Sequence, residues 1–267
     1  MTCLAPRTSG MIDDIRTITR RNLTHWVNRP ATVVVGWLFP VMVILMFGTL
    51  FGGAIETPGN GRYYEYLMPG MFAMTMLFGL ESTMAAVAAD AAKGVTDRFR
   101  SLPMSSAAVV AGRCAADLLN TVIALAVVVG TGLAVGWQWH HGLGDALAAV
   151  ALLLMLRFAL LWVGIYLGLV VAGPESVAVV QVLVWPLLFL SNAFVDTATM
   201  PRWLGTIADW NPLSATASAV RALCGNPGWS GASWISAHSV AAAVLWPLLI
   251  TVVFLPLAVR RFRALGN

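Results

Sequence analysis

The sequence predicts an all-α integral membrane protein with six transmembrane helices. Of its 267 residues, 59% are hydrophobic and only 10% are charged, and the mean hydropathy is +0.80. A water-soluble domain of this length carries about 25% charged residues to cover its surface. The chain also contains six long apolar segments, each near the roughly 20 residues that a helix needs to cross a bilayer. These observations exclude a soluble globular protein.

The predicted spans are residues 33–51, 67–89, 107–135, 146–172, 177–194 and 239–259. The third segment is too long for one crossing and carries Arg113 and Asp117 near its start. Because charged side chains are costly inside a bilayer, we expect its first three turns to stand in water and residues 118–137 to cross. Residues 33–259 then form one transmembrane domain. It lies between an N-terminal tail (1–32) and a basic C-terminal tail (260–267).

The distribution of cations predicts that both termini are cytoplasmic. Twelve of the 16 Lys and Arg residues fall on the same side as the termini: Arg7, Arg16, Arg20, Arg21, Arg29, Lys93, Arg98, Arg100, Arg113, Arg260, Arg261 and Arg263. Arg62, Arg202 and Arg221 fall on the opposite side, and Arg157 lies within a span. An excess of Lys and Arg marks cytoplasmic loops. This topology explains the net charge of +4 without a nucleic-acid partner.

The N-terminal tail contains no apolar segment of the kind that a signal peptide requires. In it, Ile12, Ile15, Leu23 and Trp26 recur at helical spacing between charged residues. This pattern favours an amphipathic helix lying in the cytoplasmic membrane interface. A disordered basic tail is the alternative.

The outer segment 195–238 has helical patterning on both sides of Asn211-Pro212, where a break is expected. The second piece carries Arg221. Non-helical backbone at membrane depth is tolerated only where protein or water satisfies it. We therefore expect a re-entrant or surface-lying helical hairpin before the last span.

Two ionisable residues, Glu81 and Arg157, lie well inside predicted spans. Burying such groups is costly, so they are candidates for function. They pair with each other across helices in one interpretation. In the other, Glu81 faces a water-filled vestibule and Arg157 extends to the lipid headgroups.

The sequence offers no sign of an enzyme site. A phosphate-binding P-loop needs G-x-x-x-x-G-K-[ST], but the single lysine, Lys93, lies between Ala92 and Gly94. The three cysteines are far apart, and His140-His141 has no third ligand nearby. We expect no catalytic residue, no metal site and no cofactor bound by this chain.

The cytoplasmic loop between the second and third spans is predicted to hold a short amphipathic helix over about residues 90–102, ending before Pro103. Phe99 and Leu102 would supply an apolar anchor for a cytoplasmic partner. Asp97, Arg98 and Arg100 would form its polar rim. The alternative is an ordinary positive-inside loop.

The stretch DAAKGVTDRFRSLPMS resembles the pattern between spans two and three of ABC (ATP-binding-cassette) type-2 export permeases. The matching residues are Asp90, Gly94, Arg98, Leu102, Pro103 and Ser105. Residues 200–223 resemble the outer segment of the same family, in which an aromatic-containing helix precedes Asn-Pro-Leu and a later Arg. Within the family, the chain is most similar to the daunorubicin-resistance drug-export permeases.

This resemblance implies the transmembrane subunit of an exporter of a lipophilic or amphipathic substrate, such as a drug, a lipid or a polyketide-like compound. It implies a second permease subunit, identical or related, and separate ATPase subunits that use ATP and Mg²⁺. It also implies a multi-pass location in the cell membrane, the inner membrane of a bacterium. The ATPase-coupling residues would be Asp90, Gly94, Asp97, Arg98, Phe99, Arg100, Leu102 and Pro103.

Two other classes compete with this interpretation. A proton- or ion-coupled secondary transporter would use Glu81 and Arg157, and its transport would survive ATP depletion. The internal repeat typical of such transporters is not visible in the sequence. A non-transporting membrane assembly factor would need no ATPase partner.

Overall fold

The computed structural model describes residues 19, 30–53, 62–92, 106–171, 174–228 and 233–264. Within these ranges every regular element is helical. The long helices are α2 (Pro30–Phe51), α3 (Tyr63–Ala92), α5 (Ser106–Ala134), α6 (Leu143–Val170), α7 (Pro174–Phe189) and α11 (Ser239–Ala264). The short ones are η2 (Thr197–Thr199), α8 (Arg202–Asp209), α9 (Pro212–Cys224) and α10 (Trp234–Ala237). The prediction of an all-α membrane protein is confirmed.

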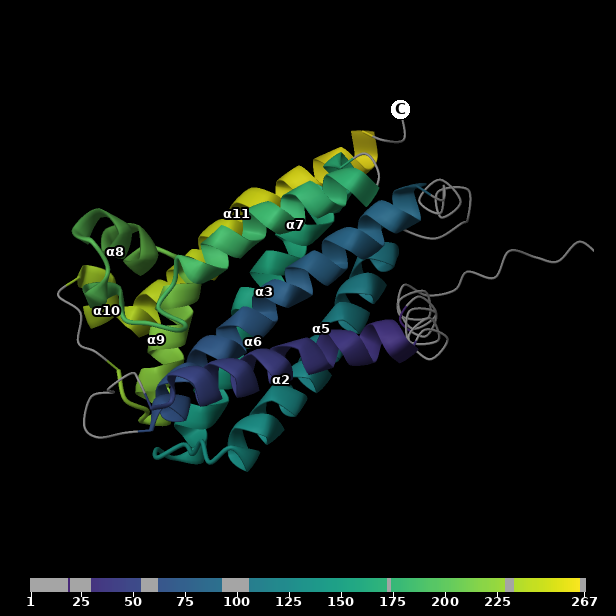
Figure 1. Ribbon diagram of the computed structural model, residues 1–267. Helices are drawn as coiled ribbons and strands as arrows, with labels where there is room; N and C mark the ends of the chain where they lie inside the picture. Colours follow the sequence, from purple (N-terminus) through teal and green to yellow (C-terminus); the bar gives the residue numbers. More distant parts are fainter. Residues whose placement is uncertain are drawn as a thin grey trace, which may run out of the picture.

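The long helices form one bundle whose two ends differ (Figure 1). The C-terminus of α11 lies at the same end as the end of α3 and the start of α5. We call this the C-terminal end of the bundle. The short helices α8 and α10 gather at the opposite end, which we call the hairpin end.

Five of the six predicted spans correspond to helices that are long and apolar enough to cross a membrane. The fifth predicted span, 177–194, is too long, because α7 ends at Phe189 and its apolar part begins at Val177. The 16 residues of α7 reach about 24 Å, less than the roughly 30 Å of a hydrocarbon core. The chain leaves the helix there because the backbone of residues 192–194 bonds to side chains of other helices.

Two other boundaries differ from the prediction. The apolar part of α5 runs from Ala111 to Ala134, so the crossing predicted for 118–137 begins and ends too late. Asp117 is not standing in water, because its carboxylate meets side chains of α3 and α6. The last helix continues to Ala264 and so includes most of the predicted basic tail.

Little of the N-terminal tail is described. Thr19 is helical, and its hydroxyl donates to the Gly112 carbonyl of α5 over 3.1 Å. The rest of the predicted interfacial helix lies outside the described residues, so that prediction stays untested. At Thr19 the tail touches the third membrane helix.

Helix α3 lies at the centre of the bundle and packs closely on α6. Gly164 and Gly168 of α6 make this approach possible. A Cβ atom at Gly164 would lie 2.9 Å from the Leu80 carbonyl oxygen, and one at Gly168 would lie 2.7 Å from that of Met84. Small residues at such spacing allow membrane helices to approach each other. Here they face a helix of the same chain.

Helix α9 is inserted among α3, α6 and α11. Its residues Ala215, Thr216, Ala217 and Ala219 are completely buried. The outer segment is therefore not simply surface-lying. Its second helix belongs to the core, while α8 exposes Trp203 and Ile207.

The predicted break at Asn211-Pro212 is confirmed, and Asn211 joins two helices there. Its Oδ1 accepts a hydrogen bond from the Leu213 amide over 2.9 Å and so caps the start of α9. Its Nδ2 donates to the carbonyls of Leu187 and Leu190, both at 2.7 Å, at the end of α7. One side chain thus satisfies backbone groups that two helix ends leave open.

Replacing Asn211 by Ala should lower the thermal unfolding temperature of the purified protein by several degrees. The change removes a helix cap worth about 1 kcal/mol and two hydrogen bonds of about 1 kcal/mol each. Asn211→Ser keeps a side-chain oxygen that can cap α9, so it should lower the unfolding temperature by less. A melting temperature for Asn211→Ala equal to that of the native protein, measured in the same detergent, would contradict this role.

Candidate functional site

Arg157 is completely buried on α6, with 1% of its surface exposed. Its Nε donates to the hydroxyl of Thr121 on α5 over 2.9 Å, and its Nη2 donates to the hydroxyl of Thr83 on α3 over 2.7 Å. Asp117 Oδ2 lies 2.8 Å from the Thr83 hydroxyl and 3.9 Å from Arg157 Nη2. A guanidinium in an apolar interior needs such partners, because no water is there to solvate it.

The counter-ion of Arg157 is therefore Asp117, and neither sequence-based interpretation of this arginine is correct. It does not pair with Glu81, and it does not extend to the headgroups. The backbone of α3 makes room for it at Gly79, where a Cβ atom would lie 2.6 Å from Arg157 Nε. The guanidinium belongs to α6, and its partner side chains come from α3 and α5.

A second ion pair lies one helical turn from Asp117, toward the C-terminal end of the bundle. Arg113, one turn before Asp117 on α5, donates to Asp90 Oδ2 of α3 over 2.8 Å. Asp90 lies in the last turn of α3, which ends at Ala92. We call Asp90, Arg113, Asp117, Thr83, Thr121 and Arg157 the polar ladder. It runs from the bundle interior to the start of the predicted coupling loop.

Of the predicted coupling residues, only Asp90 is described, and the ladder includes it. The others, Gly94, Asp97, Arg98, Phe99, Arg100, Leu102 and Pro103, lie outside the described residues. Their coupling role stays a prediction.

Arg221 of α9, predicted in the outer hairpin, is a second buried arginine, with 3% of its surface exposed. Its Nη2 donates to the Asn192 carbonyl over 2.7 Å, and its Nε donates to the Tyr66 carbonyl over 3.0 Å. Its guanidinium also lies over the Tyr66 ring, 3.9 Å from the centroid. This cluster fastens the linker after α7 to α3 and α9. Its role is structural.

Glu81 lies on another face of α3 and is partly exposed. Its carboxylate interacts with the side chain of Gln181 on α7. Within the described ranges, no cation lies at ion-pair distance from it. A carboxylate in a membrane without a counter-ion is available to a cationic ligand or a proton.

A continuous series of aromatic rings begins one turn from Glu81. In order along the bundle it contains Phe78, Phe39, Trp185, Phe189, Phe194, Phe47 and Phe51, and we call it the aromatic row. Successive ring centroids are between 4.3 and 6.1 Å apart. The row bridges α2 and α7, and part of it faces outward, since Trp185 and Phe189 are exposed.

The described part of the chain holds no group of three or more His, Cys, Asp or Glu side chains suited to a metal ion. His140 instead lies 3.6 Å from Glu65, and His141 contacts the Leu223 carbonyl over 3.1 Å. These two histidines connect the loop after α5 to α3 and α9.

Asp117 is not a functional candidate from the sequence alone, because its position near the start of a long apolar segment predicts exposure to water. The spacing of two charged residues in the sequence could have indicated its role. Arg113 and Asp117 are four residues apart, so they lie on one face of a helix. Thr83 and Thr121 carried no recognisable signal, because hydroxyl residues are common in membrane helices.

Together, the fold and the site define a multi-pass helical membrane protein. Its polar ladder leads from the bundle interior to the C-terminal end of the bundle. The family model for the ABC-2 type transporter matches residues 13–224. The chain is 35% identical over 228 residues to the daunorubicin resistance ABC transporter permease protein DrrB1 of Streptomyces coeruleorubidus, covering 85% of this chain and 77% of that protein.

Two more distant relatives are also named as transport permeases. The chain is 26% identical over 233 residues to the putative transport permease ycf38 of Cyanophora paradoxa, covering 86% of this chain and 78% of that one. It is 24% identical over 210 residues to the probable doxorubicin resistance ABC transporter permease protein DrrC of Mycobacterium tuberculosis, strain H37Rv, covering 76% and 74%. The chain belongs to the ABC-2 type transporter family and is a membrane-spanning permease subunit located in the cell membrane.

Replacing Arg157 by Met should strongly reduce the yield of folded protein, because it leaves Asp117 partly buried without its counter-ion. Breaking one side of a buried pair costs about 3–5 kcal/mol. Arg157→Met combined with Asp117→Asn should recover part of the yield, measured as the monodisperse fraction in size-exclusion chromatography.

The matched control combines Arg157→Met with Glu81→Gln. We expect no recovery from it, because Glu81 is not a partner of Arg157. Equal recovery in the two double variants would contradict the assignment of Asp117.

Proposed function

We propose that this chain is the permease of an ATP-driven exporter whose substrates are amphipathic aromatic cations. The observation that carries the proposal is the aromatic row with Glu81 beside its first ring. Aromatic rings bind flat apolar molecules by stacking, and a carboxylate without a counter-ion binds a positively charged amine. The two features lie on the same side of the bundle, between α2, α3 and α7.

The names of two relatives support a drug-like substrate. One is a daunorubicin resistance permease and the other a probable doxorubicin resistance permease. The first relative covers most of this chain at 35% identity. We therefore infer a compound of that general type, without assigning a particular one.

Energy for transport would come from separate ATPase subunits, which would bind ATP and Mg²⁺. This chain would not be an enzyme. The ATPases would dock on the loop between α3 and α5 at the C-terminal end of the bundle, which the distribution of cations predicts to be the cytoplasmic end. The polar ladder supports this route, since it begins at Asp90 beside that loop and continues to Arg157 in the interior.

A second permease subunit, identical or related, would complete the transport path. Helices α2 and α7 expose many large apolar side chains, including Val35, Met42, Val182 and Leu183. The aromatic row lies along the same two helices. In a dimer built on this face, the row would line the space between subunits.

A proton-coupled transporter is the second candidate, because a carboxylate such as Glu81, which has no ion-pair partner among the described residues, could also carry a proton. The two functions differ in the energy source that drives transport. ATP depletion would stop an ABC exporter, whereas collapse of the proton gradient would stop a proton-coupled carrier.

The first test is recovery of the ATPase partner. Affinity purification of the native chain from mild detergent should recover a P-loop ATPase, and Arg98→Glu should abolish this recovery by reversing a charge in the docking loop. Arg202→Glu, on the hairpin end, is the matched control and should retain the partner. Absence of an ATPase in several mild detergents would overturn the ABC mechanism for this chain.

A second test addresses the substrate. Glu81→Gln should reduce export of a cationic aromatic dye by about tenfold, the effect of losing about 1.4 kcal/mol of binding, and should leave export of a neutral aromatic dye nearly unchanged. Glu65→Gln on the same helix is the control and should preserve both. Equal loss for both dyes in Glu81→Gln would contradict charge recognition at this position.

A further inference from the structure

A large apolar cavity lies inside the bundle, beneath the hairpin end. Its volume is about 440 Å³. The walls come from α3, α6, α7 and α11, including Leu80, Leu160, Leu187 and Phe254, and Trp210 lies at its hairpin end. Helix α7 lines the cavity with Val184 and Leu187, and α11 lines it with Ile250 and Phe254. Leu187 is also exposed, so the cavity opens at the α7 side.

The walls of this cavity are almost entirely apolar. Among the described lining residues, the polar side-chain groups are the indole N–H of Trp210 and the amide of Asn211, and the hydrogen-bonding groups of that amide already have partners. Its Nδ2 bonds to Leu187 and Leu190, and its Oδ1 bonds to Leu213. Apolar cavities of about 150 Å³ stay dry and accept benzene. One of about 440 Å³ therefore suits a longer hydrocarbon rather than water.

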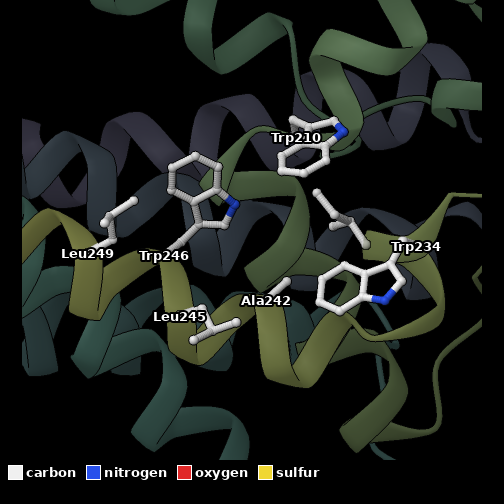
Figure 2. A pocket seen from close by; sticks show the side chains of 7 residues that line it. Trp210, Trp234, Ala242, Leu245, Trp246 and Leu249 are labelled. Atoms are coloured by element: carbon white, nitrogen blue, oxygen red, sulfur yellow. The ribbon is translucent and has the colours of Figure 1, made fainter.

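A second pocket, of about 270 Å³, adjoins the first at Trp210, which lines both. Figure 2 shows Trp210, Trp234 and Trp246 around it, with Leu245 and Leu249 along α11. Leu245 and Leu249 are exposed on α11, a membrane-spanning helix, so the pocket opens toward the bilayer. Indole rings favour the boundary between headgroups and hydrocarbon.

Helix α8 borders this site through Ile207 and through Trp210 at its C-terminal end, both of which line the larger cavity. Trp203, Ile207 and Trp210 are exposed at helical spacing, with 68%, 52% and 57% of their surfaces free. Such a stripe suits a helix lying in the membrane interface. Arg202, the first residue of α8, is exposed beside it, whereas the other cation of the described outer segment, Arg221, is buried.

We propose that the two pockets form a binding site for a membrane phospholipid. One acyl chain enters between α7 and α11 and fills the larger cavity, and Trp210 and the smaller pocket hold the lipid near its glycerol. The phosphate lies at the level of Arg202, which supplies the complementary charge. The lipid packs against both α7 and α11, which line opposite sides of the larger cavity. This lipid site does not depend on which compound the protein exports.

Photo-crosslinking tests this site in the full-length protein reconstituted into nanodiscs. The probe is a phosphatidylglycerol with a diazirine near the end of one acyl chain, and mass spectrometry maps the labelled residues. We expect labels on cavity residues such as Leu160 and Phe254. Leu187→Trp, which narrows the opening, should reduce this labelling about fivefold.

Leu248→Trp is the matched control, because Leu248 is an exposed leucine on α11, which also lines the cavity, but Leu248 itself lines neither pocket. It should leave labelling nearly unchanged. Labels confined to outward residues such as Val252, or equal labelling of the two variants, would show annular lipid only and overturn the proposal.

The phosphate is tested with a diacylglycerol carrying the same diazirine chain. The native protein should label more with the phospholipid than with the diacylglycerol, and Arg202→Gln should remove that difference while labelling of the cavity persists. An unchanged preference in Arg202→Gln would overturn the assignment of the phosphate to this residue.

Discussion

The burial of the Arg157 guanidinium is the constraint on which the arrangement of this bundle depends. A charge with 1% of its surface exposed is tolerated in an apolar interior only when protein groups replace water around it. Those groups come from two other helices: Thr83 of α3, and Thr121 and Asp117 of α5. Because hydrogen bonds require short distances, the three helices can adopt only a narrow range of relative positions.

Arg221 imposes a similar constraint at the hairpin end, where it binds the backbone of Tyr66 and Asn192. Both arginines hold α3, one near each end of its buried length. The helices outside these networks, α2 and α7, are left with exposed apolar faces and an aromatic row between them. The polar interactions thus stabilise the centre of the bundle and leave its periphery for substrate, lipid and a second subunit.

Helix α3 connects the proposed functions. One of its faces carries Thr83 and Asp90, which belong to the polar ladder, and another carries Phe78 and Glu81, which face α7. In the proposed exporter, a displacement at the Ala92 end of α3 would therefore reach both the buried arginine and the substrate surface. A rigid helix transmits such a displacement along its length, whereas a loop would absorb it.

The sequence by itself determined the membrane class, five of the spans, the break at Asn211-Pro212 and the family resemblance, because hydropathy, turn chemistry and short motifs are local properties. It also identified Arg157 and Glu81 as unusual, since any charge within a span is costly. Only the tertiary structure decided that Asp117 is the counter-ion, that α9 is buried and that α7 and α11 line a common apolar cavity. These facts depend on which helix faces meet, and residues such as Thr83 and Arg157 are too far apart in the chain for local patterns to reveal that contact.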